Sequence, residues 1–489
     1  MRKFIIAAFT VVLAVVAFSS ASPDERIPPK KEAPLPVDKR GVSYSFEQDK
    51  TPAEDMALLA PGGDVPGIKW FYNWYVRPEA VAWEAAQEHK VFFYPMIWNG
   101  PFDKDEREEA LVRFLEANPE CEWIMGFNEP NLKDQANYTP KQAAKHWPKL
   151  IKIAKKYNLK VLSPAMNYGW GVGVIPDKRN PDVNKDDGYW SAWRWLDEFF
   201  GIDHVDENSG QLLKNKGFKG VSLNDIDAIA IHSYMPDAGA LKWFVSQFRK
   251  YNKPIWLTEF CSWEYSQPNA AWQNLEYQMM FMSEAIPYLE MDPTIEKYAW
   301  FIPKGSEDEH VIPANKLLTK GPNPQLTPLG IVFVNMGTCD KTKWIPAGER
   351  IVAAHFSDMI FSEYIFKLDE PNWPRKEQGF TKNSGVHFRP GTDPTGEALD
   401  MFDFTRMKWV EYQVETPEAK TYTLSLRNTA EEATNIEILV NGESAATVSL
   451  RPTSAWTTTT VPLRLEAGRH QLRLKVVDGD CALNWLQLN

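Results

Sequence analysis

The sequence has little cysteine, no excess of positive charge and few long apolar runs, and each shortage excludes a class of protein. Only four of the 489 residues are cysteines, and none has a partner at metal-ligand spacing. The eight histidines form no H-x-x-x-H or similar cluster. We therefore expect no catalytic metal, no cofactor, and a fold held by its size rather than by disulfides. The formal net charge of −11 argues against nucleic-acid binding, which needs a basic face.

The one long apolar run lies at the N-terminus and has the composition of a secretion signal. Met1-Arg2-Lys3 is a basic start, Phe4 to Phe18 is almost unbroken apolar sequence, and small residues follow. This pattern predicts a signal peptide at 1–21 and a secreted or periplasmic protein. The run is too short for a membrane anchor, and no other segment has the length to span a bilayer. The proline-rich stretch at 22–40 is a predicted linker, and we expect a monomer without membrane contacts.

Eight short apolar or aromatic runs follow, separated by helical patterns. The runs are 41–46, 68–74, 91–98, 123–129, 160–167, 228–234, 255–260 and 298–303. One intervening helix begins with a capping box, Thr139-Pro140-Lys141-Gln142. Such a repeat predicts a (β/α)8 TIM barrel over 41–337. An open doubly wound sheet would carry an early glycine-rich phosphate turn, which is missing here.

The pattern of apolar and polar residues changes after a second predicted linker at 338–347. Alternating strands fill 348–489, and Asn441-Gly442 between two of them is a strong hairpin signal. We expect an all-β sandwich there. The longest gap between barrel runs, 168–227, is rich in aromatic residues and either shapes a cleft or contains an ordinary amphipathic helix at 190–200.

The segment W-I-M-G-F-N-E-P-N, residues 123–131, places a carboxylate at the end of a buried strand. Its uncharged start indicates a strand covered on both faces, and Pro130 ends that strand. A carboxylate is costly to desolvate, so Glu129 must be used or paired. It is either a catalytic acid or a strand-end glutamate bridged to a lysine or arginine.

A second glutamate, Glu259, ends the seventh run and faces Glu129 across the mouth of an eight-stranded barrel. Two carboxylates on one cleft are what glycosidic bond cleavage requires. In a retaining enzyme they lie about 5–5.5 Å apart, one as acid/base and one as nucleophile. We assign the first role to Glu129 and the second to Glu259.

Other strand ends supply candidate substrate contacts. Asn128 is placed to bond a sugar 2-hydroxyl, and Asn167 ends the fifth run. His232 and Tyr234 could hold Glu259 by hydrogen bonds, although a core histidine is the alternative for His232. Trp300 could form the apolar floor beneath the sugar.

Five motifs within 41–337 carry a resemblance to a known family: G-F-N-E-P-N, L-S-P-A-M-N, I-H-S-Y, W-L-T-E-F and Y-A-W-F. Together they resemble the family 128 glycoside hydrolases of clan A, which are mainly endo-β-1,3-glucanases. The resemblance implies Glu129 as acid/base and Glu259 as nucleophile. It also suggests Asn73, Trp74 and Trp98 as cleft residues, although early-strand aromatics more often serve packing.

The C-terminal segment resembles carbohydrate-binding modules of family 6 or 35, through W-V-E-Y-Q-V, S-A-W-T-T-T-T and L-N-W-L among other motifs. The resemblance implies that Trp456 stacks on a sugar and that Asn484 bonds its hydroxyls. The family's acidic opening is replaced here by I-V-A-A at 351–354, so two glutamates that often help to hold calcium are missing. The alternative is a packing domain that shields the barrel.

We therefore expect a secreted, retaining endo-glycosidase that hydrolyses β-1,3-glucan of the laminarin or curdlan type. Two alternatives stay open. One is another clan A β-glycanase, acting on β-1,4 or mixed-linkage glucan. The other is a non-catalytic glycan-binding protein built on an inactive barrel.

Overall fold

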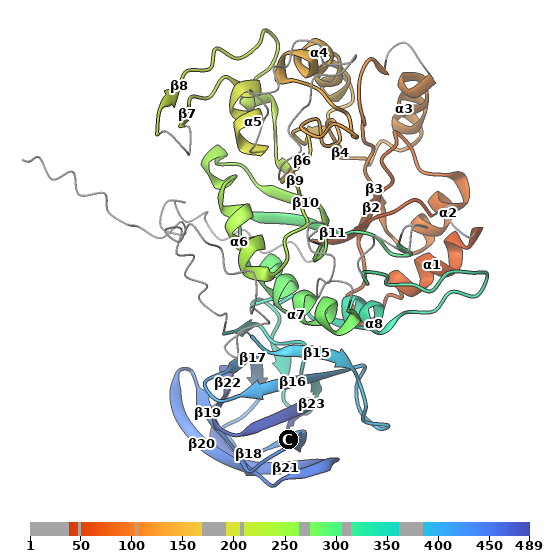
Figure 1. Ribbon diagram of the computed structural model, residues 1–489. Coiled ribbons are helices and arrows are strands. Elements are labelled where there is room, and N and C mark those ends of the chain that lie inside the picture. The colour runs from red at the N-terminus through yellow and green to blue at the C-terminus, as the bar shows by residue number, and fades with distance from the viewer. Residues whose placement is uncertain are drawn as a thin grey trace, which may run out of the picture. The chain divides into compact units, whose positions relative to one another are not determined.

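The computed structural model describes residues 39–46, 50–102, 106–168, 192–205, 210–263, 274–305, 314–360 and 385–489 (Figure 1). The predicted signal peptide, nearly all of the first linker and much of the aromatic insertion, 169–191, lie outside the described residues. No helix in the described ranges has both the length and the apolar character needed to cross a bilayer.

A seven-stranded parallel sheet forms the centre of the N-terminal part, in the order β3-β2-β1-β11-β10-β9-β6. Its strands are β1 (Arg40–Ser43), β2 (Trp70–Tyr72), β3 (Phe92–Phe93), β6 (Met166–Asn167), β9 (Ile229–Ser233), β10 (Ile255–Phe260) and β11 (Ile295–Trp300). A separate parallel pair consists of β4 (Trp123–Ile124) and β5 (Lys160–Val161). Each of the eight predicted runs overlaps a strand, and the strands β1 and β11 begin before the runs at 41–46 and 298–303.

The regular pairing does not close into one continuous sheet, because β3 and β6 are its edges. Single parallel bridges connect it to the β4–β5 pair: Met96 with Met125 on one side, and Leu162 with Ala228 on the other. The first and last strands, β1 and β11, pair directly. The strands are therefore parallel, as a barrel requires, while the closed (β/α)8 barrel stays a prediction, since the sheet of regular pairing is open.

Helices alternate with the strands along the chain. They are α1 (Pro52–Leu59), α2 (Ala80–Glu88), α3 (Glu106–Ala117), α4 (Pro140–Lys156), α5 (Ala192–Phe200), α6 (Ala238–Ser246), α7 (Leu275–Met291) and α8 (Pro328–Asn335). The predicted capping box starts α4: the Thr139 hydroxyl accepts from the Gln142 N–H, and the Gln142 side chain accepts from the Thr139 N–H. After α5, the strands β7 (His204–Val205) and β8 (Leu212–Leu213) pair antiparallel.

Strand alternation divides the apolar side chains of the N-terminal part into two clusters. On β10, Ile255 and Leu257 belong to the larger cluster, which includes the helices, and Trp256 belongs to a smaller one. The rings around Trp256 are Trp123 at 4.5 Å, Trp70 at 5.2 Å and Tyr94 at 5.5 Å, measured between centroids. Because neighbouring strand residues point to opposite faces, this aromatic cluster fills the inner side of the sheet.

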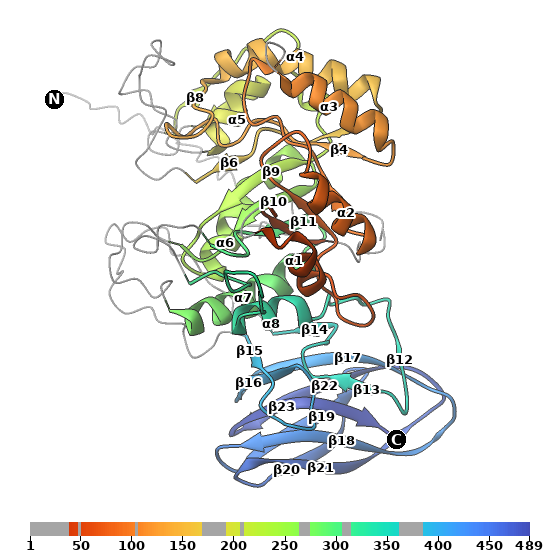
Figure 2. The ribbon, with the colours of Figure 1, turned by 90° about the vertical axis from the view of Figure 1, so that its right-hand side faces the viewer.

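The C-terminal part is built from two mostly antiparallel sheets (Figure 2). One contains β12 (Ile345–Pro346), β14 (Asp358–Met359), β17 (Trp409–Thr416), β19 (Thr434–Val440), β20 (Glu443–Leu450) and β22 (Gly468–Asp478). The other contains β13 (Arg350–Val352), β15 (His387–Pro390), β16 (Leu399–Thr405), β18 (Lys420–Ala430), β21 (Thr453–Leu465) and β23 (Asp480–Leu488). Asn441 and Gly442 join β19 to β20 with positive φ angles of 52° and 85°, as a two-residue hairpin turn requires.

All four cysteines are buried and unpaired. Burial raises the pKa of the Cys121 thiol to about 12, and it raises the pKa values of Cys261, Cys339 and Cys481 further. These side chains therefore act as small apolar residues of the core rather than as crosslinks.

Replacing Trp256 by alanine should lower the free energy of unfolding by about 3–5 kcal/mol, because it opens a cavity inside the aromatic cluster. Denaturant unfolding monitored by circular dichroism would measure the change. The control is Val81→Ala on the exposed side of α2, where the side chain is 58% exposed and the change should stay within about 0.5 kcal/mol. Equal effects of the two substitutions would contradict a core role for Trp256.

Candidate active site

Glu129 and Glu259 lie together, each only 4% exposed. Glu129 follows β4 and continues the parallel pairing, since its N–H donates to the Ala165 carbonyl at 2.9 Å. Glu259 lies in β10 beside His232 of β9, at a register irregularity that follows Leu257. One oxygen of each carboxylate and one ring nitrogen of His232 lie within 4.8 Å of one another. Two strand ends thus bring both glutamates to one small polar cluster.

His232 lies between the two carboxylates. Its Nδ1 is 2.6 Å from Glu129 Oε1 and 3.3 Å from Glu259 Oε2, and the ring is fully buried. Burial alone would lower the pKa of the imidazole, but the charges of Glu259 and Glu129 and the hydrogen bond to Glu129 raise it above its ordinary value. The Glu129–His232 pair therefore keeps a proton to a higher pH than a free imidazole would.

Glu129 has a second polar partner in Asn167. The Asn167 side-chain amide donates to Glu129 Oε1 at 2.7 Å. In the described ranges the polar partners of Glu129 are thus an imidazole and an amide, not a lysine or arginine. This arrangement does not match the alternative of a strand-end glutamate bridged to a lysine or arginine.

Glu259 accepts hydrogen bonds from three aromatic side chains. Tyr72 Oη donates to Oε1 at 2.9 Å and Trp74 Nε1 donates to the same oxygen at 2.7 Å. The Tyr234 hydroxyl donates to Oε2. Burial raises the pKa of the Glu259 carboxyl, the charge of His232 opposes this rise, and the charge of Glu129 adds to it. The bonds from Tyr234 and Trp74 favour the ionised carboxylate.

Two other predicted contacts lie on the Glu129 side. Asn128 is 3% exposed, and its Nδ2 donates to Gln135 Oε1 at 3.1 Å, while its buried Oδ1 has no hydrogen-bond partner among the residues that the structure describes. Trp98 is partly exposed and packs against the aromatic cluster, and its carbonyl accepts from the Asn128 N–H at 3.0 Å. Both residues are therefore next to the acid, with Asn128 Oδ1 left for another donor.

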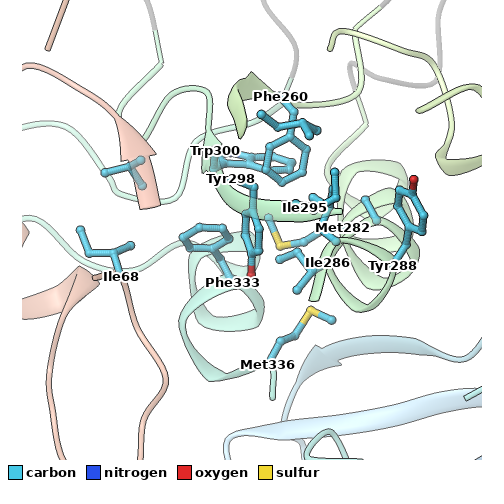
Figure 3. Close-up of a cluster of buried hydrophobic side chains, with 14 of the residues drawn as sticks. Ile68, Phe260, Met282, Ile286, Tyr288, Ile295, Tyr298, Trp300, Phe333 and Met336 are labelled. Carbon is cyan, nitrogen blue, oxygen red and sulfur yellow. The ribbon is translucent and has the colours of Figure 1, made fainter. Parts of the chain in front are cut away.

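Trp300 does not have the predicted position. Its side chain is fully buried and lies between Phe260 and Phe333 (Figure 3), with ring-centroid distances of 5.1 Å and 6.1 Å. Its Nε1 donates to the Asn315 carbonyl. The floor assignment therefore has to be corrected. Strand alternation turns Trp300 toward the helices and the following residue, Phe301, toward the site.

Phe301, Trp263 and Tyr72 lie near Glu259 and were missed by the sequence analysis. The Phe301 ring lies 5.3 Å from Tyr234, 6.1 Å from Trp74 and 6.4 Å from Trp263. Tyr72, a direct partner of Glu259, was also missed. Alternation within W-F-Y at 70–72 could have found it, because Trp70 and Tyr72 share one face of the strand.

Asn73 does not have its predicted role as a cleft residue either. Its side chain is 7% exposed and bonds the local chain: Oδ1 accepts from the Tyr75 N–H at 3.2 Å, and Nδ2 donates to the Arg77 carbonyl at 3.1 Å and to Glu79 Oε1 at 3.2 Å. Asn73 therefore shapes the turn after β2 rather than facing a ligand.

The C-terminal sandwich holds the last two predicted residues. Trp456 is partly exposed, and its Nε1 donates to Thr392 Oγ1 at 3.0 Å. Asn484 is fully buried; its amide donates to Asp400 Oδ1 at 2.8 Å and its Oδ1 accepts from the Glu397 N–H at 2.6 Å. Because these partners occupy the side chain, the predicted sugar contact of Asn484 has to be corrected to a structural role.

Comparisons with known proteins match two separate segments of the chain to family models. The family model described as glycosyl hydrolase catalytic core matches residues 54–333, and the model of carbohydrate binding module family 6 matches residues 378–489. The curated Alkali-sensitive linkage protein 1 of Schizosaccharomyces pombe is 26% identical over 237 residues, or 48% of this chain and 35% of that protein. The chain thus spans about a third of the length of this curated relative.

Solved structures provide further relatives. A family 128 (subgroup II) endo-β-1,3-glucanase from Pseudomonas viridiflava is 31% identical, with a TM-score of 0.46, over 60% of this chain and 96% of that one. A subgroup II endo-β-1,3-glucanase from Sorangium cellulosum is 28% identical, with a TM-score of 0.44, over 60% and 97%. The family model spans more than half of the 489 residues, including both glutamates, and so the chain belongs to the glycosyl hydrolase catalytic core family.

Proposed function

We propose that the protein is a retaining endo-β-1,3-glucanase, with Glu129 as acid/base and Glu259 as nucleophile. The observation that carries this proposal is the pair of buried carboxylates with oxygens within 4.8 Å of each other. The proposal includes a (β/α)8 barrel, in which the isolated bridges beside β3 and β5 complete the ring. Hydrolysis of a polymer fits a protein exported from the cell, so the proposal also includes secretion.

The first step would cleave the glycosidic bond and form a glycosyl-enzyme. A Glu259 oxygen attacks the anomeric carbon while Glu129 gives its proton to the departing glycosidic oxygen. The Glu129–His232 contact supplies a retained proton beside the leaving group. The donors on Glu259 favour the ionised carboxylate that attacks.

The second step would release the sugar with the same anomeric configuration. Glu129, now ionised, takes a proton from water, and the oxygen of that water displaces Glu259 from the anomeric carbon. Retention is supported by the carboxylate separation. An inverting enzyme needs roughly 6.5–9.5 Å between its carboxyl groups to admit water. One oxygen of Glu129 and one of Glu259 lie within 4.8 Å of each other, which favours retention.

The substrate class rests on the sequence relatives and on the motifs. Two structural relatives, at 31% and 28% identity, are described as endo-β-1,3-glucanases. The partly exposed aromatics Trp263 and Phe301, which lie beside Tyr234 near Glu259, offer apolar faces of the kind that sugar rings contact. Retention of both glutamates with their hydrogen-bond partners speaks against the alternative of a non-catalytic glycan-binding barrel.

Incubation with laminarin, curdlan and cellulose would test the activity. We expect oligosaccharides from the first two polymers and none from cellulose, with the β-anomer as the first product in proton NMR. Glu259→Gln should reduce the rate on the order of 10³-fold or more, because it removes the nucleophile. Glu88→Gln, an exposed change on α2, is the matched control. Absence of products from both β-1,3-glucans would refute the proposal, and the α-anomer as first product would refute retention.

The pH profile of kcat/KM should be bell-shaped, and the pKa values that govern its acid and basic limbs should both lie above those of an ordinary glutamate and an ordinary histidine. The nucleophile must be ionised, so activity is lost as pH falls through the pKa of Glu259, which burial raises above the ordinary value of a glutamate. The acid needs the proton kept by the Glu129–His232 pair, so activity is lost as pH rises through the pKa of His232, which the two carboxylates raise above the ordinary value of a histidine.

His232→Gln should narrow the pH range of activity at both its acid and its basic end. Glutamine holds no titratable proton for the acid, and loss of the imidazole charge removes an effect that lowers the pKa of Glu259. His89→Gln is the control, since His89 lies after α2 and its ring contacts the Ala60 carbonyl. An unchanged profile in His232→Gln would contradict the role of the shared proton.

We further propose that the sandwich binds the same glucan through the Trp456 ring. Binding to insoluble curdlan would be measured in the Glu259→Gln background, which prevents digestion. Trp456→Ala should weaken binding about two- to tenfold, since it removes one aromatic contact. Trp344→Ala, whose ring lies beside Arg469, should change nothing. Equal binding of Trp456→Ala and its parent would remove this residue from the glucan site.

A further inference from the structure

The turn after β2 holds a tryptophan in a backbone conformation that large side chains rarely adopt. Trp74 has a φ of +59°, in the left-handed region. For a non-glycine residue, and above all for a bulky one, this region is disfavoured by contacts of Cβ with the backbone. Such a conformation persists only where the surroundings enforce it, and it is found preferentially at functional sites.

Asn73, which precedes Trp74, bonds the backbone on the far side of this residue. Its Oδ1 accepts from the Tyr75 N–H, two residues on, in the manner of an Asx-turn. Its Nδ2 bonds the Arg77 carbonyl and Glu79 Oε1, and Glu79 Oε1 also accepts from the Ser45 hydroxyl at 3.1 Å. The turn is thus tied to the loop that follows β1 and cannot relax alone.

The strained backbone directs the indole at Glu259. Trp74 Nε1 lies 2.7 Å from Glu259 Oε1, and the ring is set between Tyr72 and Phe301, with centroid distances of 5.5 Å and 6.1 Å. The N–H of an indole is a donor only, so in this position it can serve the carboxylate but cannot accept its proton.

We propose that Trp74 is a positioning residue for Glu259, and that Asn73 holds it in the left-handed conformation that aims its indole N–H at Glu259 Oε1. This inference rests on the proposed role of Glu259 as nucleophile. Together with Tyr72, Trp74 fixes the plane of the carboxylate and stabilises its charge. The W-F-Y-N-W segment, 70–74, then supplies catalytic support rather than sugar contacts.

Trp74→Phe tests the proposal, because it keeps an aromatic ring and removes the N–H. We expect kcat on laminarin to fall about tenfold to a hundredfold while KM changes less than about threefold, since a hydrogen bond to a charged group is lost. The acid limb of kcat/KM should move up by about one pH unit, because ionised Glu259 loses a donor.

Asn73→Ala should move the acid limb in the same direction, and Asn73→Ser should recover part of the loss, since a serine hydroxyl can accept from the Tyr75 N–H. Trp83→Phe, on α2 beside Phe114, is the control for a general tryptophan effect and should change neither quantity. Circular dichroism and thermal unfolding would establish that each variant is folded. A raised KM with an unmoved acid limb in Trp74→Phe would overturn the proposal and make Trp74 a substrate contact.

A second measurement separates this inference from the proposed activity. A water-soluble carbodiimide with an amine labels protonated carboxyl groups, and mass spectrometry of the peptide with Glu259 gives the extent of labelling against pH. The midpoint should rise in Trp74→Phe whether or not any glucan is cleaved. A shifted midpoint in a protein inactive on glucans would overturn the proposed function and leave this inference standing. An unshifted midpoint in an active enzyme would overturn the inference alone.

Discussion

The close approach of two carboxylates in a buried site is the constraint on which the rest of the active site depends. Glu129 and Glu259 are each 4% exposed, so their mutual repulsion is poorly screened by water. His232 lies between the two carboxylates and offsets this repulsion. Each carboxylate also has its own donors, Asn167 for Glu129 and three aromatic side chains for Glu259. The two glutamates thereby acquire different surroundings, which is the condition for different roles in one reaction.

The aromatic cluster on the inner face of the sheet continues into this polar site. Trp70 lies among Tyr94, Trp256 and Tyr72, and Tyr72 in turn donates to Glu259. A donor that stands on packed aromatic rings has few alternative rotamers. The same strand, β2, therefore contributes to stability at one end and to the orientation of a carboxylate at the other.

Much of this site could be predicted from the sequence, because strand ends and charge are local properties. Glu129 and Glu259 were found as carboxylates at the ends of apolar runs, and His232 and Tyr234 as their neighbours on the next strand. The misplaced residues were those whose role depends on which way a strand faces. Trp300 and Phe301 differ by one position and point to opposite faces, and β10 and β11 change register between Leu257 and Phe260. Asn73 and Asn484 were assigned to ligands for another reason, since an asparagine that bonds the protein itself has the same sequence signature as one that bonds a ligand. Asn73 bonds the turn in which it lies, and Asn484 bonds Glu397 and Asp400 of a distant segment.

The four buried thiols have a consequence for how this chain can lose its structure. In the folded protein they are shielded and protonated, so an oxidising environment leaves them unchanged. Unfolding exposes all four at once, at positions 121, 261, 339 and 481, and their ordinary reactivity returns. Disulfides that form in the unfolded chain then have no native counterpart and trap it. In an oxidising environment, the lifetime of the folded protein is therefore set by its rate of unfolding rather than by its equilibrium stability.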